Sequence, residues 1–318
     1  MRIVIIGGTG HIGTYLAPWL ISDGHEVVVI SRGGRAPYRR HSAWQRIESV
    51  VLDRQAAEAD GSFGARVAAL NPDAVVDLVC FNPESARQLV EALRGRVELL
   101  AVCGTIWVHG HSVEVPTVET QPRKPFGAYG VQKAALEAYL LQEAHGNGFP
   151  VTILHPGHIV GPGWAPLNPA GNFNLGVFEK LARGEPLCLP NLGLETVHHV
   201  HAEDVAQAFV LALYHRNWAI GESFHAVSPA ALTLRGYAES IAEWYGRTAE
   251  LTYLPWEEWR KTVSEEDGAK TWDHIAHSPN CSCAKAKTLL GYQPRYTSLQ
   301  AVFEALEWLA GHGLIGIS

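Results

Sequence analysis

The sequence predicts an α/β protein: a doubly wound parallel sheet in its first half, followed by a smaller lid domain. Short, almost continuously apolar segments alternate with longer helical segments up to about residue 160, which is typical of parallel strands covered on both faces. A glycine-rich turn directly follows the first apolar segment. Beyond residue 160 the chain becomes rich in loops, and its 318 residues suffice for two unequal domains.

The expected elements follow one another from the N-terminus. Six apolar strands are predicted at residues 2–6, 26–30, 47–52, 74–80, 97–103 and 151–155. Helices are predicted at about residues 11–23, 84–94 and 127–145, and a further helix at 202–213 is expected to return to the sheet. We therefore expect one domain at residues 1–160, joined again by 202–225, and a second domain mainly at 161–318.

Composition and charge exclude several classes of partner. The formal net charge is −7, so the chain lacks the basic surface expected of a protein that binds nucleic acid or an anionic membrane. No apolar run is long enough to cross a bilayer, and Met1 leads into a strand rather than a signal peptide. The five cysteines are odd in number and lack framework spacing. We expect a cytoplasmic protein that acts on a small molecule.

The turn after the first strand has the sequence Gly-Gly-Thr-Gly-His-Ile-Gly. Glycines allow a tight turn and let backbone N–H groups approach a pyrophosphate at a helix N-terminus. An ordinary glycine-rich turn is the alternative, but the preceding strand and the following helix favour a Rossmann-like dinucleotide site. The residues expected to contact the dinucleotide here are Gly7, Thr9, Gly10, His11, Ile12 and Gly13.

The second strand ends without the carboxylate that usually binds the ribose hydroxyls of NAD. Ser31 and Arg32 stand there instead, and the planar guanidinium of Arg32 is suited to a 2′-phosphate. NADP is therefore the preferred cofactor, with NAD possible; a solvated surface arginine is the alternative. Asp53, after the third strand, could accept a hydrogen bond from the adenine amino group or simply close a turn.

Tyr129 and Lys133 are four residues apart in a predicted helix and so share one of its faces. A tyrosine phenol ordinarily has a pKa near 10. A neighbouring ammonium and a positively charged nicotinamide ring favour the phenolate, which suits the pair to acid–base catalysis. Such pairs are common and often mean only a tyrosine beside a surface lysine, so other residues must decide.

Motifs along nearly the whole chain decide the matter. Besides the glycine turn, Asp53 and the Tyr-Lys pair, they are Thr105-Ile-Trp-Val-His-Gly110, Pro156-Gly-His-Ile-Val-Gly-Pro-Gly163, His201-Ala-Glu-Asp-Val-Ala206 and Leu290-Gly-Tyr-Gln-Pro294. In this ordered set the chain resembles the extended short-chain dehydrogenase/reductases, also called the NAD-dependent epimerase/dehydratase family. The resemblance is specific for the family and not for one reaction.

The resemblance implies roles for individual positions. Thr105 would hydrogen-bond the reacting oxygen, and Tyr129 would be the acid/base. Lys133 would bind the nicotinamide ribose and tune Tyr129. The backbone from Pro156 to His158 would hold the nicotinamide carboxamide, and Cys80 and Phe81 would lie along the cofactor.

Departures from the family's patterns narrow the substrate. Dehydratases of the family carry an acidic pair after the catalytic threonine, where this chain has Ile106 and Trp107, which argues against 4,6-dehydration. Sugar-nucleotide enzymes often carry an Arg-Asp pair where this chain has Val197 and His198. A free sugar, a sugar acid or another small polyol or ketone remains possible. Candidate substrate contacts, each with packing as its alternative, are Phe81, Trp107, Trp164 and Asn172.

These observations predict an NAD(P)-dependent oxidoreductase or epimerase that transfers hydride at a carbinol or carbonyl carbon of a sugar-like substrate. The alternative is a non-catalytic NADP-binding regulatory or RNA-associated protein on the same fold.

Two further expectations concern metal and assembly. Histidines at 198, 199 and 201, with His155 elsewhere, lack the acidic or cysteine partners of a ligand set, so no metal is expected. The family commonly forms dimers through the helix with the Tyr-Lys pair, where Leu136, Tyr139 and Leu140 would supply part of an apolar stripe. We therefore expect a homodimer.

Overall fold

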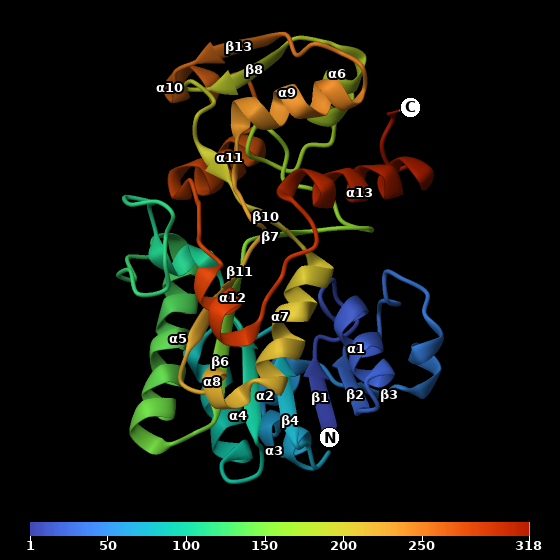
Figure 1. Cartoon of the computed structure of the whole chain (residues 1–318), viewed down its shortest axis with the longest axis vertical. Helices are drawn as coiled ribbons and strands as arrows, with labels where there is room; N and C mark the ends of the chain where they lie inside the picture. Colours follow the sequence, from blue (N-terminus) through green and yellow to red (C-terminus); the bar gives the residue numbers. More distant parts are fainter. Residues whose placement is uncertain (318) are drawn as a thin grey trace.

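The computed structural model describes residues 1–317, which form two lobes (Figure 1). The larger lobe contains a seven-stranded sheet in the order β11-β6-β5-β4-β1-β2-β3, with every neighbouring pair parallel. Its strands are β1 (Arg2–Ile6), β2 (Glu26–Ser31), β3 (Glu48–Val51), β4 (Ala74–Asp77), β5 (Leu99–Cys103), β6 (Val151–Pro156) and β11 (Ser223–Ala226). This order confirms the predicted Rossmann-like fold, with one further strand beyond β6.

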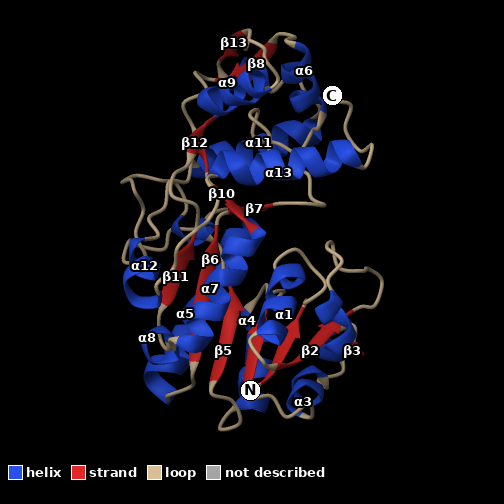
Figure 2. Ribbon diagram, turned by 45° about the vertical axis from the view of Figure 1, so that its right-hand side comes forward, coloured by secondary structure: helices blue, strands red, loops and turns tan. Residues whose placement is uncertain are grey.

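Helices cover both faces of this sheet, as Figure 2 shows. One face packs against α1 (Gly13–Ser22) and α7 (Ala202–Tyr214), and the other against α4 (Pro83–Leu93) and α5 (Gly127–Asn147). The alternation along β1 is clear, since Ile3 and Ile5 enter the first core while Val4 and Ile6 enter the second. Shorter helices complete this lobe: η1 (Ser42–Arg46), α2 (Arg54–Ala59), α3 (Phe63–Ala68), η2 (Ile106–His109) and α8 (Arg216–Ala219).

The smaller lobe has a hydrophobic core of its own, around the buried side chains of Phe178, Tyr237 and Trp259. Its helices are α6 (Gly176–Arg183), α9 (Leu234–Trp244), α10 (Trp256–Trp259), α11 (Glu265–His277) and α13 (Ser298–Gly311). Its strand pairs are β8 (Leu187–Pro190) with β13 (Leu251–Leu254), and β9 (Thr196–Val197) with β12 (Leu232–Thr233). The pair β7 (His158–Val160) and β10 (His199–His201) lies where the two lobes meet (Figure 1).

The chain returns to the larger lobe near its C-terminal end as well. Helix α12 (Ala284–Leu290) contacts β11 and α7, and Cys283, Ala286 and Tyr292 belong to the core on the α1/α7 face. From sequence alone, this segment is expected in the second domain, residues 161–318. The spacing of apolar residues along a helix indicates that one of its faces is buried. It does not indicate which lobe that face packs against.

The apolar stripe expected for dimerisation is absent from the surface of α5. Leu136 and Leu140 are 1% and 0% exposed and belong to the protein's own core, and Tyr139 is only partly exposed. This corrects the residues proposed for the contact, because the apolar face of α5 packs against the sheet of its own chain. The homodimer itself stays a prediction.

None of the helices in residues 1–317 has the length and apolar character needed to span a membrane.

Candidate active site

The glycine turn between β1 and α1 has the geometry of a phosphate-binding loop. Gly7 has a φ of +83°, and the N–H of Gly10 donates to its carbonyl at 3.0 Å. A Cβ on Gly8 would lie 2.8 Å from Val29, and one on Gly13 would overlap the backbone carbonyl of Gly8. Helix α1 has no side-chain cap and no acidic residue in its first turn. The N–H groups of Thr14 and Tyr15 already donate to the carbonyls of Gly10 and Ile12, so an anion would bind the N–H groups that precede them in the turn.

Aromatic side chains cover this turn. His11 is 3% exposed, its Nε2 lies 3.3 Å from the carbonyl oxygen of Pro162, and burial lowers its pKa to about 3, so the ring is neutral. Trp164 packs edge-on against His11 with 4.1 Å between ring centroids, and Tyr38 packs on the same ring. Trp164 was expected beside the substrate. The structure places it beside the phosphate-binding turn instead, because residues 161–164 fold back over His11.

The predicted adenosine-side residues lie along the ends of β2 and β3. Ser31 accepts a hydrogen bond from the N–H of Gly33 at 3.3 Å, and Arg32 is exposed. Within residues 1–317, no hydrogen bond or ion pair occupies the guanidinium of Arg32. Asp53 caps α2 by accepting from the N–H of Ala56 at 3.1 Å. The turn role considered for Asp53 is thus present, with one carboxylate oxygen engaged.

Lys133 lies buried beneath the site, with 2% of its surface exposed. Its ammonium donates to the backbone carbonyls of Cys80 and Cys103 at 2.6 and 2.7 Å. An ammonium has three N–H donors, so one remains for a ligand. Burial lowers the pKa of Lys133. Its Nζ lies 4.8 Å from the ring centroid of Phe81 and 5.8 Å from that of Tyr129, which brings the predicted pair together.

Tyr129 and Thr105 complete the predicted catalytic group at the carboxyl edge of the sheet. Thr105 follows β5, caps η2 and is 7% exposed, whereas Tyr129 stands in the first turn of α5 and is 44% exposed. Burial raises the pKa of Tyr129 to about 12, and its interaction with the Thr105 side chain acts in the opposite direction. The phenol is therefore protonated at neutral pH in the protein without cofactor.

The stretch from Pro156 to His158 is already hydrogen-bonded within the protein. The N–H of Gly157 donates to Ala226 at 3.3 Å, and that of His158 donates to His198 at 2.7 Å. These two N–H groups are therefore occupied and are not free donors for a nicotinamide carboxamide. The side chain of His158 is different: its Nδ1 accepts from the N–H of His198 at 3.3 Å, and its Nε2 has no partner among the described residues.

The four candidate substrate residues have different surroundings. Phe81 is 51% exposed beside Lys133. Trp107 meets Tyr129 edge-on at 5.9 Å but stacks one face on His277, so packing takes one of the two faces expected to bind a sugar. Asn172 is 1% exposed, and its amide bonds Asn168 and Thr271 at 2.6 and 3.1 Å. Both ends of its amide hold the loop together, and its role as a substrate contact stays a prediction.

Residues of α11 reach the site and were missed by the sequence analysis. His277 stacks between Trp107 and Phe126, and His274 packs against Trp107 and His158. Burial lowers the pKa of His277 to about 4 and also lowers that of His274, so both rings are neutral at pH 7. Their spacing of three residues puts them on one helix face. The spacing is visible in the sequence, but it does not predict which part of the protein α11 packs against.

Comparison with known proteins agrees with this geometry. The model of the NAD dependent epimerase/dehydratase family matches residues 3–225. A chloroplast stem-loop binding protein of Arabidopsis thaliana is 25% identical over 98% of this chain and 80% of its own length. A bovine dTDP-D-glucose 4,6-dehydratase is 29% identical over 68% of this chain and 57% of its own length.

A solved structure of UDP-glucose 4-epimerase from Thermotoga maritima, with UDP-glucose, superposes with a TM-score of 0.74. The superposition covers 98% of this chain and 99% of that one at 21% identity, which shows a shared fold. The family match extends over β1 to β11 and so includes the glycine turn, Thr105, Tyr129 and Lys133. The chain belongs to the NAD-dependent epimerase/dehydratase family.

Proposed function

We propose that the protein is an NAD(P)-dependent oxidoreductase or epimerase acting at a carbinol or carbonyl carbon of a sugar or sugar-like molecule. The observation that carries this proposal is the position of Tyr129 beside Thr105 and above the buried ammonium of Lys133. A bound nicotinamide would supply or remove the hydride. Tyr129 would exchange a proton with the substrate oxygen, and Thr105 would hold that oxygen.

The protonation state of Tyr129 suits a proton donor. With its pKa raised to about 12, Tyr129 carries its proton at pH 7 and can give it to a carbonyl oxygen during reduction. Oxidation needs the phenolate, which the positive charges of Lys133 and of an oxidised nicotinamide would favour. The remaining N–H of Lys133 is the donor for the nicotinamide ribose.

We further propose that NADP is preferred over NAD. Arg32 is exposed at the end of β2 and has no ion-pair partner among residues 1–317, so its guanidinium is free for a 2′-phosphate. Gly33 follows it with a φ of +75°, and a side chain there would press on Val51. Hydrogen bonds to charged groups are worth about 1.5–3 kcal/mol, and solvent exposure lowers that figure.

The rings beside the catalytic group favour an uncharged, hydroxyl-bearing substrate. His158, His274 and His277 are neutral because burial lowers the pKa of each, so they offer hydrogen bonds without charge. His198, at one position of the family's Arg-Asp pair, is buried, and its Nε2 lies 3.0 Å from the carbonyl oxygen of Ser228. A free sugar or polyol therefore fits better than a nucleotide diphosphate.

Loss of water from the substrate is not part of the proposed reaction. Dehydratases are among the curated relatives, but the two residues after Thr105 here are Ile106 and Trp107. Ile106 is 4% exposed, and Trp107 stacks on His277. Neither side chain can exchange a proton, so the acid and base of a 4,6-dehydration are missing from these positions.

The test is mass spectrometry of cofactor and small molecules retained by the purified protein. We expect NADP(H) or NAD(H) to copurify. Oxidised cofactor that resists exchange would identify an epimerase, whereas freely exchanging cofactor would identify a dehydrogenase or reductase. The rival function, a non-catalytic or RNA-associated protein, predicts no turnover of any sugar or polyol in the presence of either cofactor.

We also propose a cytoplasmic homodimer, which a concentration-independent monomer in sedimentation would contradict.

A further inference from the structure

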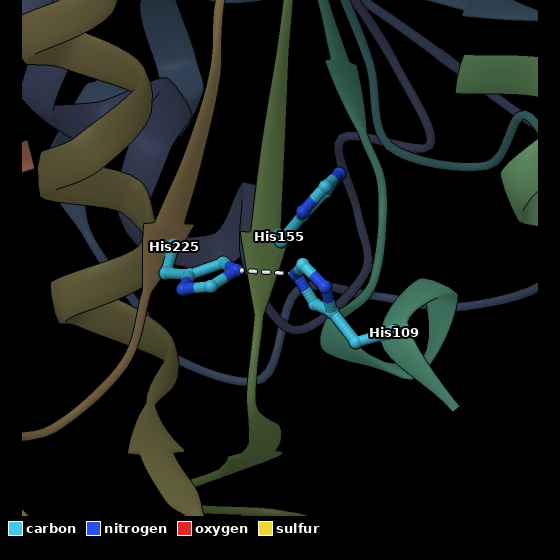
Figure 3. Close-up of side chains that lie close together, drawn as sticks. All are labelled: His109, His155 and His225. Carbon is cyan, nitrogen blue, oxygen red and sulfur yellow. Dashed lines mark hydrogen bonds between the residues drawn. The ribbon is translucent and has the colours of Figure 1, made fainter. Parts of the chain in front are cut away.

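Three buried histidines from distant parts of the chain meet beside the catalytic loop. His109 ends η2, His155 lies in β6 and His225 lies in β11. His155 and His225 are opposite one another in the parallel register of their strands, so both side chains project from the same face of the sheet. Ring nitrogens of the three residues lie within 4.8 Å of one another (Figure 3).

Hydrogen bonds determine which nitrogens are free. Nδ1 of His225 lies 3.1 Å from the carbonyl oxygen of Ser282 and donates to it, which leaves an Nε2 lone pair facing Nε2 of His109 at 2.9 Å. Within residues 1–317, Nδ1 of His109 and Nδ1 of His155 have no hydrogen-bond partner. Buried polar atoms without partners are costly, so these nitrogens are suited to bind a ligand.

The surroundings supply negative charge and a supporting carboxylate. An oxygen of Glu137 lies 3.4 Å from Nε2 of His155. Arg123 donates to the other oxygen of Glu137 at 2.7 Å, which fixes the carboxylate beside His155. Glu119 accepts from the backbone N–H of His225 at 2.8 Å. Two buried carboxylates, those of Glu119 and Glu137, therefore lie close to the three histidines.

We propose that His109, His155 and His225 bind one divalent transition-metal ion, with zinc the best fit. Neutral imidazoles suit zinc, and a carboxylate behind a ligating histidine is a recurrent feature of zinc sites. Zn–N bonds of about 2.0–2.1 Å put tetrahedral ligand nitrogens roughly 3.3 Å apart. The 2.9 Å between His109 and His225 would open by a few tenths of an ångström on binding. A water molecule would fill the fourth position.

Such an ion would position the catalytic loop without taking part in hydride transfer. His109 lies four residues after Thr105, and His155 lies three residues before His158. A side chain at Gly104, directly before Thr105, would overlap the ring of His155, so loop and strand are already in close contact. Metal binding would tie the loop of Thr105 to the ends of β6 and β11. The site does not depend on the function proposed above.

The experiment uses the untagged full-length chain, stripped with a chelator and titrated with ZnCl₂ by calorimetry and with Co²⁺ by visible absorption. We expect one equivalent of Zn²⁺ and an intense visible Co²⁺ spectrum typical of four-coordinate geometry. His109→Gln and His225→Gln should each abolish the tight binding. Glu137→Gln should weaken it by about 10- to 100-fold. His312→Gln, which changes an exposed histidine far along the chain, is the matched control and should bind as the wild type does.

Wild-type protein that binds no stoichiometric Zn²⁺ would overturn the proposal. So would variants at His109 and His225 that keep wild-type affinity, since the ion would then lie elsewhere. Circular dichroism shows whether those variants fold. If they do not, the Co²⁺ spectrum of the wild type decides, because a weak six-coordinate spectrum excludes a site made of three buried imidazoles. None of these readings depends on catalytic turnover.

Discussion

Replacing Lys133 by methionine removes one charge and keeps the length of the side chain. The ammonium makes two hydrogen bonds to backbone carbonyls, at 2.6 and 2.7 Å, in a position that is 2% exposed. Hydrogen bonds to charged groups contribute about 1.5–3 kcal/mol each, so their loss costs roughly 3–6 kcal/mol. The lowered pKa of Lys133 shows that burial penalises its charge, and removing that charge returns several kcal/mol.

The two effects nearly cancel in the folding free energy. We expect Lys133→Met to lower the free energy of unfolding by about 0–3 kcal/mol, which corresponds to a fall in Tm of roughly 10 °C at most. Catalysis is not compensated in this way. The variant lacks the third N–H donor for the nicotinamide ribose and the cation beside Tyr129, so the rate should fall by about 10²–10⁴-fold, the range typical of general acid–base catalysis.

Three measurements separate these outcomes. Thermal denaturation gives the stability change, calorimetric titration gives the affinity for each cofactor, and steady-state kinetics gives the rate. Lys287→Met, on the exposed side of α12, is the matched control and should leave all three unchanged. A folded Lys133→Met variant with wild-type cofactor affinity and wild-type rate would refute the role assigned to the buried ammonium.

Three further predictions concern the cofactor site and the phenol. Arg32→Ala should weaken NADP(H) by about 10- to 100-fold, less at high salt, and leave NAD(H) almost unchanged in calorimetric titration; tighter binding of NAD(H) by the wild type would contradict it. Gly13→Ala should abolish cofactor binding while the circular dichroism stays near wild type, because the new Cβ overlaps the carbonyl of Gly8; retained affinity would show that the dinucleotide lies elsewhere. Tyr129 should ionise near pH 12 in the free protein rather than near 10, so the difference in tyrosinate absorption between wild type and Tyr129→Phe should be absent at pH 10. Oxidised cofactor should move that transition to lower pH, and an unchanged transition would argue against its coupling to Tyr129.

The parts of the fold that could be predicted from sequence are those set by local pattern. The apolar strands, the glycine turn and the helix with Tyr129 and Lys133 each depend on residues close together in the chain. Features that depend on how the elements pack against one another could not be predicted from the sequence. Leu136 and Leu140 have the spacing of an apolar stripe whether that stripe faces a partner or the sheet, and only the structure shows that it faces the sheet.

In the candidate site too, residues within sequence motifs could be predicted, whereas residues placed by packing could not. Thr105, Tyr129 and Lys133 belong to motifs, and the structure brings them together. Trp164 and Asn172 lie in a loop whose path is set by contacts with His11 and Thr271, which sequence spacing does not reveal. The three-histidine cluster depends on the strand register that puts residue 155 opposite residue 225. A difference of one residue in that register would point the two rings to opposite faces.

The most direct test of the account is a comparison of hydride transfer by the wild type and by Tyr129→Phe. Purified protein with NADP(H) or NAD(H) is offered free sugars, sugar acids, polyols and nucleotide sugars, and nicotinamide absorbance is followed together with product stereochemistry. We expect the wild type to convert at least one uncharged sugar or polyol. We also expect Tyr129→Phe, still binding cofactor, to convert that substrate at least about 100-fold more slowly. A Tyr129→Phe variant that keeps more than about a tenth of the wild-type rate would contradict this expectation.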